Sequence, residues 1–153
     1  MDTELELKKP KVIIVDDDTL ALKIIADTLS ETCDVTTSQN PIEVLKMVGR
    51  ENFDILISDY KMPRLSGITL IRGVTQINPD ILPIVITGFA NKEIALEALR
   101  NGAYDFIEKP IIPEMLIASV CRAWEKIKIL KVNKALIDKI KSYNKKLEEK
   151  NVS

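Results

Sequence analysis

Short apolar segments alternate five times along this chain with stretches of helical spacing, at roughly 20 to 28 residues per unit. The segments are VIIV (12–15), DVTTS (34–38), DILIS (54–58), ILPIVI (81–86) and YDFI (104–107). Strands separated by helices pair in parallel, because each crossover returns the chain to the same end of the sheet. Near-continuous apolar runs such as VIIV indicate strands buried on both faces. We therefore predict an α/β fold with a doubly wound parallel sheet of five strands. The flavodoxin-like order 2-1-3-4-5 would place the first and third strands side by side.

The last helix is the longest element that the sequence predicts. It begins at Pro113, a favourable first helical residue, and residues 113–150 contain no glycine and no further proline. At 1.5 Å per residue such a helix is about 57 Å long, which exceeds the diameter of the domain that it leaves. Its first half should pack on the sheet through Leu116, Ile117, Val120 and Trp124. We divide the chain into an N-terminal tail (1–10), the α/β domain (11–125) and a helical extension (126–153), which is either a coiled coil or a linker to an output domain.

Several classes of function are excluded by residue content. The chain has no histidine, which removes Ser-His-Asp and Cys-His nucleophiles and imidazole metal sites. Cys33 and Cys121 stand alone, without the spacing of a zinc site or a disulfide framework. No run of 18 or more apolar residues occurs, and MDTELELKKP (1–10) does not resemble a signal peptide. We therefore expect a soluble, cytoplasmic protein without membrane contact.

Charge is divided unevenly between the domain and its extension. Residues 125–150 carry nine lysines and four acidic residues, whereas residues 1–124 carry 13 basic and 19 acidic residues. A heptad also fits the extension, with Ile129, Leu136 and Tyr143 at a positions and Asn133, Ile140 and Leu147 at d positions. We favour a parallel coiled coil whose register Asn133 would set; a solvated helix, or a basic helix bound to nucleic acid or an acidic surface, stays open. Because no groove-reading motif accompanies the lysines, no direct nucleic-acid contact is expected from this chain.

Charged or hydroxyl side chains directly follow four of the predicted strands. Asp16 and Asp17 follow VIIV, Asp59 follows ILIS, Thr87 follows ILPIVI and Lys109 follows FIE. The carboxyl ends of parallel strands lie at one edge of the sheet, where ligands bind in such folds. We therefore expect these side chains to meet at one site.

The residue types at this predicted site indicate its chemistry. Carboxylates without an imidazole or thiolate form a hard-oxygen site, which suits Mg²⁺, or Mn²⁺, better than zinc. Such a cation explains how the adjacent aspartates tolerate one another. Lys109 and Thr87 add ammonium and hydroxyl donors, which suit a phosphoryl group. The set predicts phosphoryl transfer onto an aspartate, whereas Asp18 is predicted only to cap the next helix.

Four segments of the sequence resemble, in order and spacing, the signature blocks of the response-regulator receiver domain of two-component signalling. They are VIIVDDD, ILISDYKMPRLSG, IVITGFA and DFIEKP, and the resemblance covers about residues 10–125. It implies that Asp59 is the phosphoacceptor and that Thr87 and Lys109 bind the phosphoryl oxygens. A histidine kinase or phosphotransfer protein would supply the phosphoryl group. The domain would catalyse its own phosphorylation but turn over no separate substrate, so it is not expected to be an enzyme.

The same resemblance implies a metal set and a switch. Asp17 and Asp59 would ligate Mg²⁺ directly, with the Lys61 carbonyl as a third protein ligand and Asp16 acting through water. Phe106 matches the aromatic residue that switches position in this family. The peptide bond that follows Lys109 matches one that is cis in the family.

Phosphorylation of Asp59 would add charge and hydrogen-bond acceptors at the site. Thr87 would move towards the phosphoryl group and Phe106 would turn into the vacated space, which alters the surface of the fourth helix, fifth strand and fifth helix. We expect a homodimer through that surface, through the C-terminal helix, or through both. Phe89 is expected to shield the acyl phosphate from water and to slow self-dephosphorylation.

Two other functions are weighed against this one. A phosphorylation-independent pseudo-receiver would act only as a dimerisation module, although here none of the receiver residues is missing. A haloacid-dehalogenase-like phosphatase would use the Asp16 and Asp18 pair as nucleophile and acid/base. That class needs a second acidic pair downstream, and no Asp-Asp follows residue 18.

Overall fold

The predicted parallel sheet is confirmed. The computed structural model describes residues 8–88 and 91–152. All strand pairs are parallel, and their order is β2-β1-β3-β4-β5. The strands are β1 (Lys11–Val15), β2 (Asp34–Ser38), β3 (Ile55–Asp59), β4 (Leu82–Thr87) and β5 (Asp105–Glu108). Three of them end one residue later than predicted, so Asp59 and Thr87 are the last residues of β3 and β4 rather than the first residues beyond.

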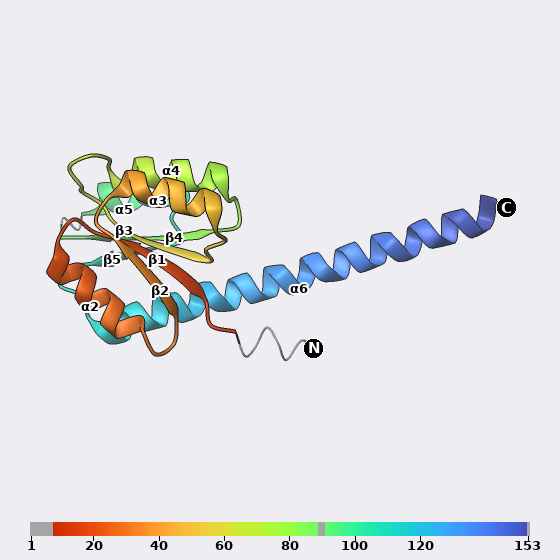
Figure 1. Cartoon of the computed structure of the whole chain (residues 1–153), viewed down its shortest axis with the longest axis horizontal. Coiled ribbons are helices and arrows are strands. Elements are labelled where there is room, and N and C mark those ends of the chain that lie inside the picture. The colour runs from red at the N-terminus through yellow and green to blue at the C-terminus, as the bar shows by residue number, and fades with distance from the viewer. Residues whose placement is uncertain (1–7, 89–90, 153) are drawn as a thin grey trace.

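Helices cover both faces of the sheet, as a doubly wound fold requires. On one face lie α3 (Pro41–Arg50), α4 (Gly67–Ile77) and α5 (Lys92–Arg100), and on the other lie α2 (Thr19–Leu29) and the start of α6 (Pro113–Val152) (Figure 1). Alternate side chains of β1 enter the two layers. Val12 and Ile14 pack with α2 and α6, whereas Ile13 and Val15 pack with α3 and α4. All four are buried, which explains why this strand is apolar at every position from 12 to 15.

Short polar side chains fix where the helices begin. Asp18, Asn40, Ser66 and Asn91 each accept a hydrogen bond from a backbone N–H in the first turn of the helix that follows. The predicted capping role of Asp18 is therefore confirmed. Gly102, after α5, has a φ of 104°, a conformation in which a side chain would be strained.

Helix α6 contains 40 residues, which corresponds to about 60 Å, and its second half extends well beyond the sheet (Figure 1). Its first half packs through the buried residues Leu116, Val120, Ala123 and Ile127. The prediction that Ile117 joins this contact is wrong, because Ile117 is 37% exposed. It lies one residue to the side of the stripe that recurs every three or four residues.

The Lys131 side chain ties α6 to Asp54, the residue before β3, and also contacts the Trp124 ring within the helix. The Nζ of Lys131 lies 3.2 Å from the Asp54 carboxylate. The same nitrogen lies 5.5 Å from the centre of the Trp124 ring, and the Nζ of Lys128 lies 6.0 Å from it. The part of α6 that contacts the α/β domain therefore extends to Lys131.

All five apolar members of the predicted heptad, from Ile129 to Leu147, are exposed. The heptad labels need one correction. The spacing is four residues from Ile129 to Asn133 and three from Asn133 to Leu136, so Asn133, Ile140 and Leu147 are the a residues and Ile129, Leu136 and Tyr143 the d residues. Among the described residues, no helix is both long and apolar enough to cross a membrane.

Leu56→Ala is expected to lower the free energy of unfolding by about 2 to 5 kcal/mol, because Leu56 lies fully buried in the central strand. Urea unfolding followed by Trp124 fluorescence measures this loss. Leu99→Ala removes the same atoms from a side chain that is 48% exposed, and should change stability by less than about 0.5 kcal/mol. Equal losses in the two variants would contradict this description of the core.

Candidate functional site

The chain after β1 holds one buried and one exposed carboxylate. Asp16 is 1% exposed, whereas Asp17 faces solvent. The Asp16 N–H donates to the Ser38 carbonyl of β2 at 3.3 Å, and Asp16 Oδ1 accepts from the Asp18 N–H at 2.9 Å. Asp16 is thereby held in place by its backbone and its side chain.

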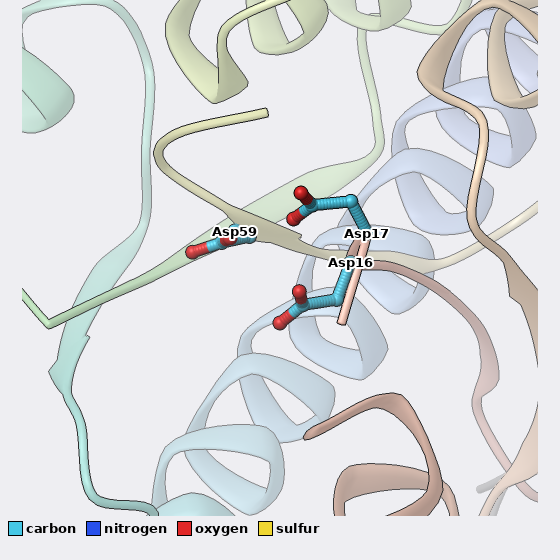
Figure 2. A group of neighbouring side chains, drawn as sticks. All are labelled: Asp16, Asp17 and Asp59. Atoms are coloured by element: carbon cyan, nitrogen blue, oxygen red, sulfur yellow. The ribbon is translucent and has the colours of Figure 1, made fainter. Parts of the chain in front are cut away.

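Asp59 comes to this position from the neighbouring strand. Strands β1 and β3 pair with Val15 opposite Ser58, so the carboxyl end of β3 lies beside the turn that carries the other two aspartates. Ligand oxygens of Asp16, Asp17 and Asp59 all lie within 4.8 Å of one another. Figure 2 shows the three carboxyl groups pointing to the same side of the sheet edge. The predicted convergence of carboxylates is therefore observed.

Lys109 lies between two of these carboxylates. Its Nζ is 3.3 Å from Asp16 Oδ2 and 3.4 Å from Asp59 Oδ1. Its backbone N–H donates to the Thr87 carbonyl at 2.8 Å, which fixes the loop after β5 to the end of β4. The Lys109–Pro110 peptide bond is cis, as the family resemblance implied.

Burial changes the charge behaviour of this group of side chains. Burial, and then the neighbouring Asp16 carboxylate, raise the pKa of Asp59 to about 6, although Lys109 opposes this shift. Burial also raises the pKa of Asp16. Partial burial acts to lower the pKa of Lys109, but the Asp16 and Asp59 carboxylates outweigh it, and the pKa is raised. Lys109 is therefore a cation, beside carboxylates that resist ionisation.

The remaining predicted site residues occupy positions around this cluster. Thr87, 1% exposed, ends β4, in which Ile86 lies opposite Asp59. Phe106 in β5 is half-buried and packs against the core cluster on the side of α3, α4 and α5. Lys61 is exposed, two residues after Asp59, and the role of its carbonyl stays a prediction. Phe89 lies outside the described residues.

The sequence did not predict two contacts at the edge of the site. One is the ion pair of Lys109 with Asp16, since the motif assigns this lysine to phosphoryl oxygens. The other joins the Tyr60 hydroxyl to Glu97, 37 residues along the chain, at 3.1 Å. No local pattern signals a side-chain contact between such distant positions, and only the fold reveals it.

The donor set fits a hard divalent cation. Carboxylate oxygens, without nitrogen or sulfur ligands, are what Mg²⁺ and Mn²⁺ prefer. Three carboxylates face one ammonium here, so the cluster carries a net negative charge when all three carboxylates are ionised. Burial and then the Asp16 carboxylate raise the pKa of Asp59, and a cation among these oxygens would offset both effects by favouring the ionised form.

Comparison with known families matches residues 12–121 to the response regulator receiver domain. The chain belongs to this family. The matched residues contain all three aspartates, Thr87 and Lys109, so the observed cluster lies within the part of the chain that matches the family. Receiver domains are signalling modules of two-component systems.

Individual relatives agree with this assignment. The C4-dicarboxylate transport transcriptional regulatory protein DctD of Rhizobium meliloti (strain 1021) is 35% identical over 129 residues, which cover 83% of this chain and 28% of DctD. Among solved structures, the BeF3-activated DrrB receiver domain is 30% identical with a TM-score of 0.73, over 77% of this chain and 99% of that one. A beryllofluoride-activated NtrC4 receiver domain dimer is 29% identical with a TM-score of 0.73, over 76% of this chain and 98% of that one. This chain spans less than half the length of the curated relatives that it matches.

The raised pKa of Asp59 predicts how stability depends on pH in metal-free buffer. The folded pKa is about 6 and an exposed aspartate has one near 4, so the folded state binds the proton more strongly between these values. Wild-type stability should therefore fall as pH rises through this window. Asp59→Asn removes the carboxylate, and its stability relative to wild type should rise from near zero at pH 4 to about 2 kcal/mol at pH 7.

Urea unfolding at pH 4, 5, 6 and 7 in EDTA measures this difference. Asp80→Asn, at an exposed position, is the matched control for the change of residue type. A wild type that gains stability relative to Asp59→Asn between pH 4 and 7 would contradict the assigned direction.

Proposed function

We propose that this receiver domain takes a phosphoryl group onto Asp59 from a phosphohistidine of a sensor kinase or phosphotransfer protein. The observation that carries the proposal is the position of the Lys109 ammonium, within 3.4 Å of Asp59 Oδ1 at the edge of a three-carboxylate cluster. An ammonium at this place can stabilise oxygens of a group attached to Asp59. These 153 residues contain no histidine, so the phosphohistidine would lie outside them, and we assign it to a partner protein.

In the transfer, an Asp59 oxygen forms a bond to phosphorus as the bond from phosphorus to the donor nitrogen breaks. Lys109 can exchange its contact with the Asp59 carboxylate for one with a phosphoryl oxygen. Thr87, at the end of the adjacent strand β4, would supply a hydroxyl donor. The domain thereby assists its own modification and acts on no separate substrate, in keeping with a signalling role.

Mg²⁺, or Mn²⁺ in its place, would neutralise charge on the transferred group when bound. We assign Asp17 and Asp59 as direct ligands, the Lys61 carbonyl as the third protein ligand and Asp16 as a ligand through water. The closeness of the three carboxylates supports this assignment. The exposure of Asp17 leaves the cation an open route from solvent.

The signal would reach the surface through Thr87 and Phe106. Movement of the Thr87 hydroxyl towards a phosphoryl group would open space beside β5, into which the half-buried Phe106 ring can turn. Phe106 carries no hydroxyl, so its ring forms no side-chain hydrogen bond in either position, and packing decides which position it takes. The surface changed by this movement is formed by α5, β5 and the first turns of α6.

Intact mass after incubation with acetyl phosphate and Mg²⁺ tests this function. The wild type should gain one phosphoryl group, and both Asp59→Asn and the addition of EDTA should abolish the gain. Asp80→Asn, an exposed aspartate, should be modified as the wild type is. If the wild type gains no mass and binds no Mg²⁺, the phosphorylation-independent pseudo-receiver, a dimerisation module, becomes the better assignment.

Two surfaces are proposed for self-association: the face of α5, β5 and α6, and the exposed heptad of α6. The NtrC4 receiver is described as a dimer when activated, which supports association in this family. The heptad presents Asn133 at an a position, a residue that favours two parallel helices in register.

We further propose that residues 11–125 form the receiver domain, with 1–10 as a tail and 126–153 as a helix that leads to an output domain or a partner. We assign the phosphoryl transfer to the cytoplasm, and we assign no direct nucleic-acid contact to this chain.

Ile140→Glu is expected to convert a dimer into a monomer if the heptad associates. Ile140 is 52% exposed at an a position, where two copies would place like charges opposite each other. Light scattering after gel filtration measures the mass. Ser142→Glu adds the same charge at a c position outside the heptad core and should leave the dimer intact. Equal masses for wild type and Ile140→Glu would limit association to the other surface.

A further inference from the structure

Helix α5 is held to the sheet by few buried side chains. Of its nine residues, all of them described, only Ala98 is buried. Leu96 and Leu99 are 38% and 48% exposed. Helix α4, on the same face, buries five of its residues: Gly67, Ile68, Leu70, Ile71 and Val74. Little apolar burial therefore fixes the position of α5, so polar contacts have more weight there than in α4.

Tyr60 connects α5 to the phosphoacceptor strand. It directly follows Asp59, and its backbone is held on both sides: its N–H donates to the Ile86 carbonyl at 2.8 Å, and its carbonyl accepts from the Gly67 N–H at 2.8 Å. From this position its hydroxyl donates to Glu97 Oε2 at 3.1 Å. The ring thus joins the residue after the predicted phosphoacceptor to the middle of α5.

The tyrosine side of this contact is rigid. A Cβ atom placed on Gly67 would lie 2.4 Å from the Asp59 carbonyl oxygen, so the turn that leaves β3 is packed against the start of α4. The hydrogen bond also spans an open groove between this turn and α5, lined by Tyr60, Lys61, Met62, Ser66, Ile68, Asn91, Ile94 and Glu97. Any relative movement across the groove is therefore taken up by α5.

We propose that the Tyr60–Glu97 hydrogen bond is a latch that holds α5 in its unphosphorylated position and so sets how readily Asp59 is phosphorylated. The inference rests on the proposed function. The contacts of Lys109 with the Asp16 and Asp59 carboxylates belong to the unmodified site. A phosphoryl group that draws Thr87 inward, at the end of β4, would shift α5, the next helix along the chain, while Tyr60 stays in place. The bond that spans the groove then breaks, and its free energy opposes phosphorylation.

The size of the effect follows from the strength of one hydrogen bond. If only the released form of α5 accepts the phosphoryl group efficiently, the initial rate is proportional to the population of that form. Removal of a partly exposed hydrogen bond should raise this population about two- to tenfold. Tyr60 is thus a positioning residue, since it acts through α5 and not on the reacting atoms.

The experiment compares Tyr60→Phe, Glu97→Ala and the double variant with wild type, using the full chain. The time course of mass increase with acetyl phosphate and Mg²⁺ gives the initial rate. Amide hydrogen exchange over residues 92–100 is followed with and without beryllofluoride as a stand-in for the phosphoryl group. Glu93→Ala, which removes the same charge from the first turn of α5, is the matched control.

Each single variant should be phosphorylated about two to ten times faster than wild type, and the double variant no faster than the singles, because both remove one bond. Exchange in α5 should rise in the unmodified protein and stay unchanged with beryllofluoride. Unchanged rates, additive effects, or equal exchange increases in both states would overturn the latch. A wild type that accepts no phosphoryl group would overturn the proposed function and the latch with it, whereas a phosphorylated wild type with an unaffected Tyr60→Phe overturns the latch alone.

Discussion

The buried contact of one lysine with two carboxylates is the interaction on which the rest of this molecule depends. Asp16 and Asp59 are 1% and 8% exposed, and Lys109 lies 3.3 and 3.4 Å from their oxygens. Buried ions are tolerated only when they are paired, so the fold must bring three separate segments to one point. The adjacency of β1 and β3 places the carboxylates, and the loop after β5 places the lysine. The strand order that builds the sheet therefore also assembles the charged side chains of the site.

The face of the sheet that carries α3, α4 and α5 is not uniformly packed. Helix α4 is tightly buried, whereas α5 contributes one buried residue. The opposite face, with α2 and the first half of α6, is closed by a continuous apolar cluster. A change of charge at the site is therefore most easily accommodated by movement of α5, since the other helices would have to expose apolar surface in order to move.

The sequence predicted the sheet because its signals are local. Val12 to Val15 read as a strand buried on both faces, Asn40 and Pro41 mark a helix start, and each strand-end aspartate follows an apolar run. Convergence of Asp16, Asp17 and Asp59 followed from parallel topology alone. The ion pair of Lys109 with Asp16 and the bond of Tyr60 to Glu97 could not be predicted, since each depends on side-chain directions set by distant segments. The burial of Ile117 was predicted wrongly because apolar spacing fixes the stripe of a helix only to within one residue.

Helix α6 continues from the core to Val152 without a break, and Lys131 fixes its rotation against Asp54. Each residue of an α-helix turns the chain by about 100°, so the orientation of whatever follows depends on the number of residues between Lys131 and that point. Seven inserted residues would nearly restore the original direction, whereas two would turn it through more than half a circle. The extension is therefore a phase-sensitive connection, in which length determines direction as well as distance.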